Sequence, residues 1–155
     1  MAGYENDEEF FSIIREMFSE KIPFNKLLGL RVESIKPDSV KIVFEKRDEL
    51  VGHYTRGTLH GGVISSVIDV TGGLSAFMDI QEKIRGESLE KRLARFARVN
   101  TIDLRVDFLR PGLGKWFVAT AFTLRAGNKV AVTRIELHND QNELIAVGTG
   151  SYVVA

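Results

Sequence analysis

Residues 60–78 read HGGVISSVIDVTGGLSAFM, the run of this 155-residue chain that carries the most structural information. The run is too long for one strand and is apolar around most of its circumference, which indicates a buried helix. Asp69 is the only charged residue in the run. A carboxylate in apolar surroundings is costly unless it is paired, hydrogen-bonded or protonated, so its presence requires a reason.

Small residues share the face of the predicted helix on which Asp69 lies. At spacings of three, four and seven residues from Asp69 they are Gly62, Ser65, Ser66, Gly72 and Gly73. The opposite face carries larger residues that suit packing under a sheet, namely Val63, Val67, Val70 and Leu74. Two interpretations stay open for the carboxylate. It belongs to a site that a ligand approaches, or it accepts structural hydrogen bonds from a neighbouring strand or Thr71.

The start of the helix favours the first interpretation. Gly61 and Gly62 lie in the first turn, where backbone N–H groups lack helical partners and the helix dipole favours negative charge. Glycine lets a ligand carbonyl come close, so these amides can hold an oxygen that gains charge. Two helical turns separate them from Asp69 by roughly 10 Å. We therefore expect the donors of one protomer to face Asp69 of another across a two-fold interface.

The segments before this helix predict a second helix and a hairpin. Asp7 can cap a helix whose apolar face comprises Phe10, Phe11, Ile14, Met17 and Phe18. Residues 30–45 alternate like two strands around the turn signal Pro37-Asp38-Ser39. Residues 47–57 are polar and without a clear period, which indicates a loop.

The segments after the helix predict a sheet. Residues 79–98 are densely charged, with Leu89, Leu93 and Phe96 at helical spacing, and indicate a solvated excursion or a short surface helix. Four strands follow near residues 99–109, 115–124, 129–138 and 144–154. The plan is α+β, an antiparallel sheet wrapped around a buried helix. We expect one domain over residues 1–155, with residues 1–22 as an N-terminal helical extension.

The composition excludes several classes of protein. The chain has 21 basic and 21 acidic residues and no cysteine, so neither nucleic acid nor an anionic membrane is an expected partner. The acidic N-terminus does not resemble a signal peptide, and we expect a cytoplasmic protein. The only histidines are His53, His60 and His138. They show no metal-ligand spacing, so no metal site is predicted.

Three motifs carry a resemblance to a known family. They are GTLHGGVI at residues 57–64 with Asp69 nine residues after His60, TIDLRVDFLRP at residues 101–111, and RAGNKVAV at residues 125–132. Together they resemble the hotdog-fold acyl-CoA thioesterases of the PaaI-like group, and the layout is closest to the YigI-like branch. The resemblance covers the chain from about Phe24 onward.

The resemblance implies a role for each matching residue. Asp69 corresponds to the general base or nucleophile, and the backbone N–H of Gly61 to the group that polarises the thioester carbonyl. His60 supports the turn, and Gly62 is a second possible donor. Thr101 matches the central-strand position that often places the water, although an ordinary strand residue would also suit it.

One position departs from the family pattern. Many members carry an asparagine six or seven residues before the histidine, where this chain has His53 and Tyr54. We favour His53 as the replacement, and either residue could form the hydrogen bond. The resemblance implies no cofactor, with coenzyme A as part of the substrate. Candidate ligands for its phosphates are Arg110, Lys115, Arg125, Asn128 and Lys129.

The family also implies a homo-oligomer, a dimer or a tetramer, because joining two sheets edge to edge covers an exposed strand and completes shared sites. Two other functions stay open. His60 and Asp69 could form the catalytic pair of an acyl-thioester hydratase or dehydratase, or the fold could bind acyl-CoA without catalysis. The length of the acyl chain, and whether it is aromatic or aliphatic, cannot be read from the sequence.

Overall fold

The computed structural model describes residues 2–36 and 38–155, with side chains from Asp7 onward. Pro37, which the sequence placed in the first hairpin turn, lies outside the described residues. The elements are α1 (Ala2–Glu16), the π-helical turn η1 (Met17–Lys21), α2 (Pro23–Leu28), β1 (Arg31–Lys36), β2 (Ser39–Glu45), η2 (Asp48–Leu50), β3 (Val51–His53), β4 (Thr58–Leu59), α3 (Gly61–Lys83), α4 (Leu89–Ala94), η3 (Arg95–Arg98), β5 (Asn100–Phe108), β6 (Trp116–Ala126), β7 (Val130–Asn139) and β8 (Leu144–Val153).

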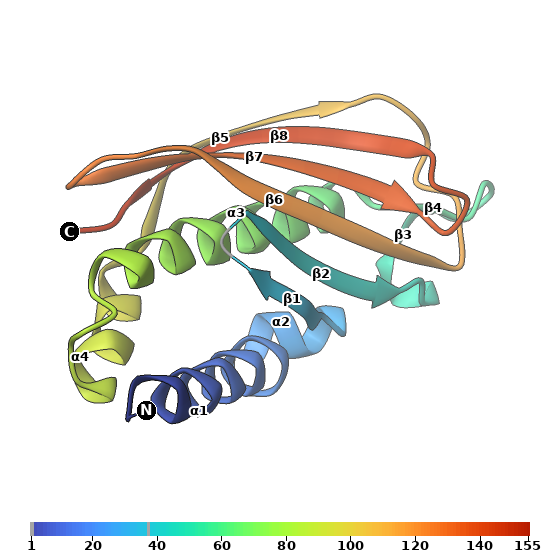
Figure 1. The fold of residues 1–155 in the computed structure, drawn as a ribbon. Helices are drawn as coiled ribbons and strands as arrows, with labels where there is room; N and C mark the ends of the chain where they lie inside the picture. Colours follow the sequence, from blue (N-terminus) through green and yellow to red (C-terminus); the bar gives the residue numbers. More distant parts are fainter. Residues whose placement is uncertain (1, 37) are drawn as a thin grey trace.

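Six antiparallel strands form a curved sheet in the order β1-β2-β6-β7-β8-β5. Helix α3 lies along the concave face and contacts every strand of the sheet (Figure 1). Buried and half-buried residues alternate along β2 and β7, which places one face of the sheet against α3. This is the hotdog fold that the sequence predicted, and the four C-terminal strands start and end within two residues of the expected positions.

Helix α3 forms the centre of the core. Its 23 residues are long and apolar enough to cross a membrane, and no second helix in the described part of the chain meets that criterion. The protein itself buries 61% of the most apolar window of α3. Packing under the sheet therefore accounts for the hydrophobicity of this helix.

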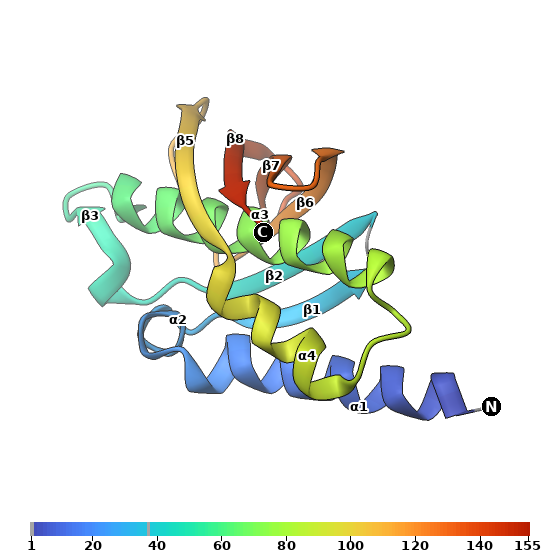
Figure 2. The ribbon, with the colours of Figure 1, turned by 90° about the vertical axis from the view of Figure 1, so that its left-hand side faces the viewer.

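The N-terminal helices form a second layer on the side of α3 and β1 that faces away from β6, β7 and β8 (Figure 2). An aromatic cluster joins the layers. The ring centroid of Phe77 on α3 lies 6.2 Å from that of Phe10 on α1 and 5.7 Å from that of Phe96 on η3. The Phe96 ring in turn lies 5.3 Å from Phe18 on η1. The apolar face predicted for residues 10–18 is thus part of the core.

One expectation about the charged segments was wrong, whereas the short helix expected within residues 79–98 is present as α4. Helix α1 begins at Ala2, so Asp7 is an internal helical residue and not a cap. Its carboxylate is buried and accepts hydrogen bonds from Arg92 Nη1 at 2.8 Å and from Arg85 Nε at 3.0 Å. The Arg92 guanidinium also lies 4.0 Å above the Phe10 ring. Residues 79–98 are therefore fastened to α1 and are not merely a solvated excursion.

Residues 47–57, expected to be a loop, contain the short helix η2 and strand β3, which pairs with β4. This ribbon packs against the start of α3. The His60 N–H donates to the Leu50 carbonyl at 2.8 Å. A Cβ atom on Gly52 would lie only 2.7 Å from His60 Cα, so the two segments pack more closely here than any residue other than glycine would allow.

Candidate active site

The Asp69 carboxylate is half-buried, where the sequence had suggested full burial, and two strands hold it. Thr101 Oγ1 on β5 donates to Asp69 Oδ1 at 2.8 Å. The Tyr152 hydroxyl on β8 donates to the same Oδ1 at 3.3 Å and to the Asp69 carbonyl at 3.0 Å. Within residues 7–36 and 38–155, no group donates to Oδ2. The carboxylate is therefore fixed by one oxygen, and the described residues leave the other without a donor.

Tyr152 was missed by the sequence reasoning. Its ring fits into a slot made by two glycines, since a Cβ atom on Gly72 would lie 2.5 Å from the Tyr152 hydroxyl and one on Gly150 would lie 2.6 Å from it. Burial raises the pKa of Tyr152, and the charge of Asp69 and the hydrogen bond to it raise this pKa further. The phenol thus stays protonated and remains a donor. Glycines inside a strand indicate close approach, so Gly150 was the available signal.

An apolar pocket of about 260 Å³ opens beside Asp69. Its walls come from the N-terminal helices, α3, η3, β5 and β8. The lining residues are Phe18, Ile22, Phe24, Asn25, Asp69, Val70, Gly73, Phe96, Val99, Thr101 and Tyr152.

A second apolar pocket, of about 500 Å³, lies nearer the start of α3. It is lined by Phe24, Leu27, Leu28, Arg47, Glu49, Leu50, His60, Gly62, Val63 and Ser66. Phe24 belongs to both pockets, which together follow the small-residue face of α3. Val63 and Val70 were expected under the sheet, and they line these pockets instead.

The first turn of α3 contains two backbone N–H groups of interest, that of Gly62, which is hydrogen-bonded, and that of Gly61. His60 is the N-cap, and its Nδ1 accepts a hydrogen bond from the Gly62 N–H at 2.8 Å. This contact supports the turn as expected and occupies the second predicted donor. For the Gly61 N–H, the described part of the chain supplies no acceptor. Gly61 lines a third pocket, of about 420 Å³, together with Phe108 and Arg110 among others.

The structure does not bring the predicted donor and the carboxylate together within one chain. Gly61 and Asp69 line different pockets, and eight helical residues separate them by about 12 Å along α3. A meeting of the two groups between protomers stays a prediction. His60 and Asp69 also line different pockets, so the pair that a hydratase or dehydratase would need is not formed in the chain.

His53 is not brought to the carboxylate either. It is exposed on β3, its Nδ1 lies 2.9 Å from Thr55 Oγ1, and it lines none of these three pockets. Its neighbour Tyr54 is 91% exposed. A role for either residue at Asp69 of the same chain is therefore not supported.

The cations predicted to bind coenzyme A do not form one cluster. Arg110 lies at the start of α3, in the pocket of Gly61. Arg125, Asn128 and Lys129 lie at the turn between β6 and β7, next to the end of α3, where Lys83 Nζ donates to the Ala126 carbonyl at 3.0 Å. Among the described residues, no group of three His, Asp or Glu side chains is placed to hold a metal ion.

Comparisons with known proteins agree on one family. The family model "Thioesterase superfamily" matches residues 56–146. The medium/long-chain acyl-CoA thioesterase YigI of Escherichia coli (strain K12) is 43% identical over 99% of each chain. A crystal structure from Shewanella oneidensis, related to the thioesterase superfamily, superposes with a TM-score of 0.91, at 41% identity over 96% of this chain and 97% of that one. A structure from Syntrophus aciditrophicus SB gives a TM-score of 0.88, at 56% identity over 97% and 99%.

Proposed function

The chain belongs to the thioesterase superfamily and is an acyl-CoA thioesterase, and from this premise we propose that hydrolysis takes place at Asp69. The observation that carries the proposal is the unequal hydrogen bonding of the two oxygens of the Asp69 carboxylate. Thr101 and Tyr152 hold Oδ1, while Oδ2 has no donor among the described residues, and an apolar pocket lies alongside. A carboxylate placed in this way can accept a proton from water or attack a carbonyl carbon.

In the proposed reaction, Asp69 takes a proton from a water molecule whose oxygen attacks the thioester carbon. The Gly61 N–H stabilises the charge that develops on the carbonyl oxygen. The carbon–sulfur bond then breaks, and coenzyme A leaves as a thiolate that takes up the proton. If Asp69 attacks directly, water hydrolyses the resulting mixed anhydride, and the products are the same free acid and coenzyme A. No cofactor enters this proposal.

The two apolar pockets on α3 are proposed to hold the acyl chain. Phe24 joins them, and Phe18 and Ile22 line the wall opposite Asp69. Apolar side chains dominate both linings, which suits an aliphatic chain. The Escherichia coli relative is named for medium and long chains, and we propose the same substrate class here.

We also propose that the working enzyme is a homo-oligomer with shared sites. Strand β5 forms one edge of the sheet, and it leaves Ile102 54% and Phe108 55% exposed. Pairing this edge with a second copy would cover it. The Phe108 ring lies beside Gly61, so the same pairing would bring the amide of one protomer toward its partner. Whether the assembly is a dimer or a tetramer, and its cytoplasmic location, stay predictions.

Asp69→Asn tests the proposal. We expect kcat for decanoyl-CoA to fall by roughly 10²- to 10⁴-fold because the amide cannot accept the proton. Affinity for a non-hydrolysable thioether analogue should stay within a small factor, because Asn keeps the shape of the side chain. Asp79→Asn is the matched control, a second half-buried carboxylate of α3 outside the three pockets described above. Undiminished release of free thiol by Asp69→Asn would reject the assignment.

A further inference from the structure

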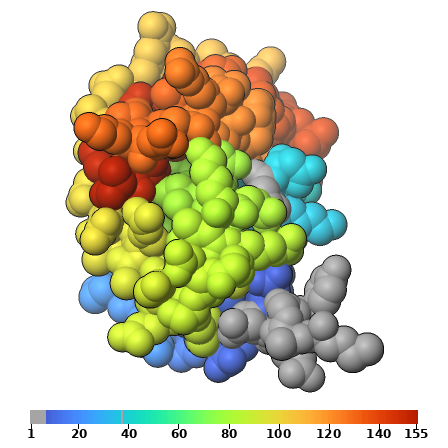
Figure 3. Space-filling view, turned by 60° about the vertical axis from the view of Figure 1, so that its left-hand side comes forward, coloured from blue at the N-terminus to red at the C-terminus, as the bar shows by residue number. Residues whose placement is uncertain are grey.

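Positive charge is concentrated in one segment of the sequence, although the net charge of the chain is zero. Residues 83–98 contain six Lys or Arg and two Glu. Two of the six, Arg85 and Arg92, bind Asp7. The other four belong to the end of α3, to α4 and to η3. The end of α3, α4 and the turn between β6 and β7 lie on one face of the molecule (Figure 3).

A pocket of about 240 Å³ lies within this basic region. It is lined by Ile84, Glu87, Lys91, Ala94, Arg95 and Arg98. Lys91 Nζ pairs with Glu87 at 3.1 Å. No carboxylate in residues 7–36 or 38–155 pairs with the Arg95 or Arg98 side chain. Two arginines thus line a concave surface together with two apolar residues, Ile84 and Ala94.

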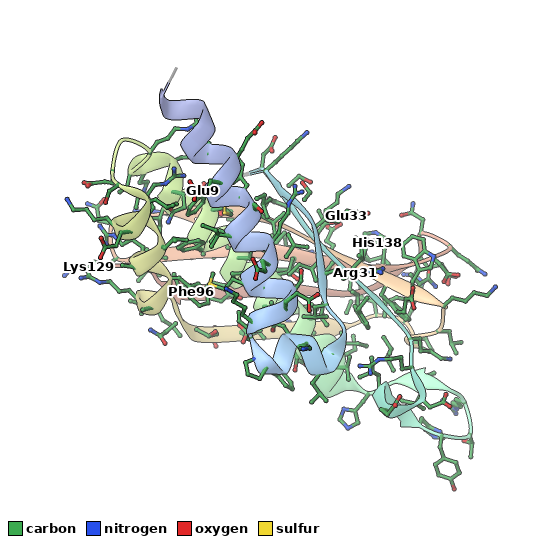
Figure 4. All side chains as sticks on the ribbon, turned by 90° about the horizontal axis from the view of Figure 1, so that it is seen from below. Glu9, Arg31, Glu33, Phe96, Lys129 and His138 are labelled. Atoms are coloured by element: carbon green, nitrogen blue, oxygen red, sulfur yellow. The ribbon has the colours of Figure 1, made fainter. Side chains whose placement is uncertain are left out.

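The basic pocket adjoins the pocket of Asp69 through a single turn of chain. Phe96 and Val99 line the Asp69 pocket, while their neighbours Arg95 and Arg98 line the basic one. Thr101, which donates to Asp69, follows Arg98 by three residues, a span of at most about 10 Å. Phe96 and Lys129 lie toward the same side of the molecule, away from Arg31 (Figure 4).

We propose that this basic pocket binds the phosphorylated nucleotide end of coenzyme A. Arg guanidinium groups match phosphate oxygens with paired N–H donors, and the apolar residues suit the face of a base. The inference rests on the proposed function, because it needs a thioester carbonyl near Asp69 with the pantetheine arm leading outward past η3. It assigns binding roles to Arg95 and Arg98, which the family resemblance did not indicate.

The test compares two substrates that differ only in the nucleotide. Decanoyl-CoA carries it, and decanoyl-pantetheine does not. In the double variant Arg95→Gln and Arg98→Gln, we expect KM for decanoyl-CoA to rise about tenfold because two charged phosphate contacts are lost. KM for decanoyl-pantetheine and kcat for both substrates should be unchanged. Arg31→Gln, an exposed cation of β1, is the matched control and should change neither KM.

Two results would overturn the inference. One is an unchanged KM for decanoyl-CoA in the double variant, and the other is an equal rise for both substrates, which would indicate a distorted pocket. Titration calorimetry with 3′,5′-ADP provides a readout that needs no turnover, and equal affinity in wild type and double variant would also overturn it. Failure of the proposed function gives a different result, in which Asp69→Asn still releases free thiol from both substrates.

Discussion

The Tyr152 hydroxyl is the donor to Asp69 whose contribution can be isolated most cleanly. Tyr152→Phe keeps the ring in its slot between Gly72 and Gly150 and removes only the O–H group. We expect kcat to fall about tenfold, since one hydrogen bond to a charged group is lost, with little change in KM. Tyr54→Phe, an exposed tyrosine, is the control. An unchanged kcat in Tyr152→Phe would limit Tyr152 to a packing role.

The residues of the site differ in how far the sequence revealed them. Asp69 was evident because a lone carboxylate in an apolar helix needs an explanation, and the family motif indicated Thr101. Tyr152 was not evident, because its contact spans 83 positions and a tyrosine near the end of a strand is ordinary in composition. The occupation of the Gly62 amide by His60 depends on a side-chain rotamer, which no residue pattern encodes.

Among the elements, α3 contains a glycine that permits close packing against Tyr152 of β8. A methyl group on Gly72 would lie 2.5 Å from the Tyr152 hydroxyl and 2.8 Å from Thr133 Oγ1. Gly72→Ala should destabilise the protein by about 1–3 kcal/mol despite the better helix propensity of alanine. Activity should fall with it as Tyr152 moves. Gly86→Ala has no atom within 4 Å of its added methyl group and is the control, and equal urea midpoints for the two variants would contradict the packing argument.

The buried ion pair that joins α1 to α4 has a stability that depends on pH. Burial alone would raise the pKa of Asp7, but the hydrogen bonds and charges of Arg92 and Arg85 hold it below its ordinary value of 3.8. The pair therefore contributes its full stabilisation above that value, and the contribution is lost as the pH falls through the folded-state pKa. Asp7→Ala leaves Arg92 buried without this partner and should cost about 3 kcal/mol near neutral pH.

Urea unfolding of Asp7→Ala and wild type at several pH values checks this prediction. The two stabilities should converge as the pH falls below 3.8. Glu8→Ala, an exposed neighbour on α1, should behave like wild type at neutral pH. A gap between Asp7→Ala and wild type that does not change with pH would point to packing and not to charge.

The elements themselves were largely predictable, since amphipathic periodicity fixes strands and helices locally. The errors arose where a contact between residues far apart in the sequence determines the local structure. Asp7 suits a helix cap by residue type, yet Arg92, 85 positions later, makes it an internal ion-pair partner. The ribbon of β3 and β4 has almost no apolar alternation, and it is ordered by its contacts with the start of α3.

For the whole molecule, the central prediction is that each site takes its amide from one protomer and its carboxylate from another. Gly61→Pro tests this, because proline removes the N–H at the first helical position, where it is well tolerated. His60 has φ −62° and ψ 135°, a conformation that accepts a following proline. Gly61→Pro and Asp69→Asn should each be inactive alone.

Mixing the two variants under conditions of subunit exchange should restore activity. In a random mixture of dimers half are hybrids, and each hybrid has one intact site of two, so about a quarter of wild-type turnover should return. Native mass spectrometry of the mixture gives the fraction of hybrid dimers, and with it the extent of exchange. Complete exchange without recovery would show that donor and carboxylate act within one chain.

Phe24 lines both apolar pockets, and different parts of the chain supply the reacting groups and the rest of the pocket lining. In the proposed site, the groups that face the thioester belong to α3, β5 and β8. Phe18, Ile22, Phe24 and Asn25, ahead of the first strand of the sheet, line the same pocket. Substitutions in residues 18–25 can change the length or shape of the pocket proposed for the acyl chain. They leave Asp69, Thr101 and Tyr152 in place. Selectivity in such an enzyme can therefore diverge quickly among descendants that retain the same chemistry.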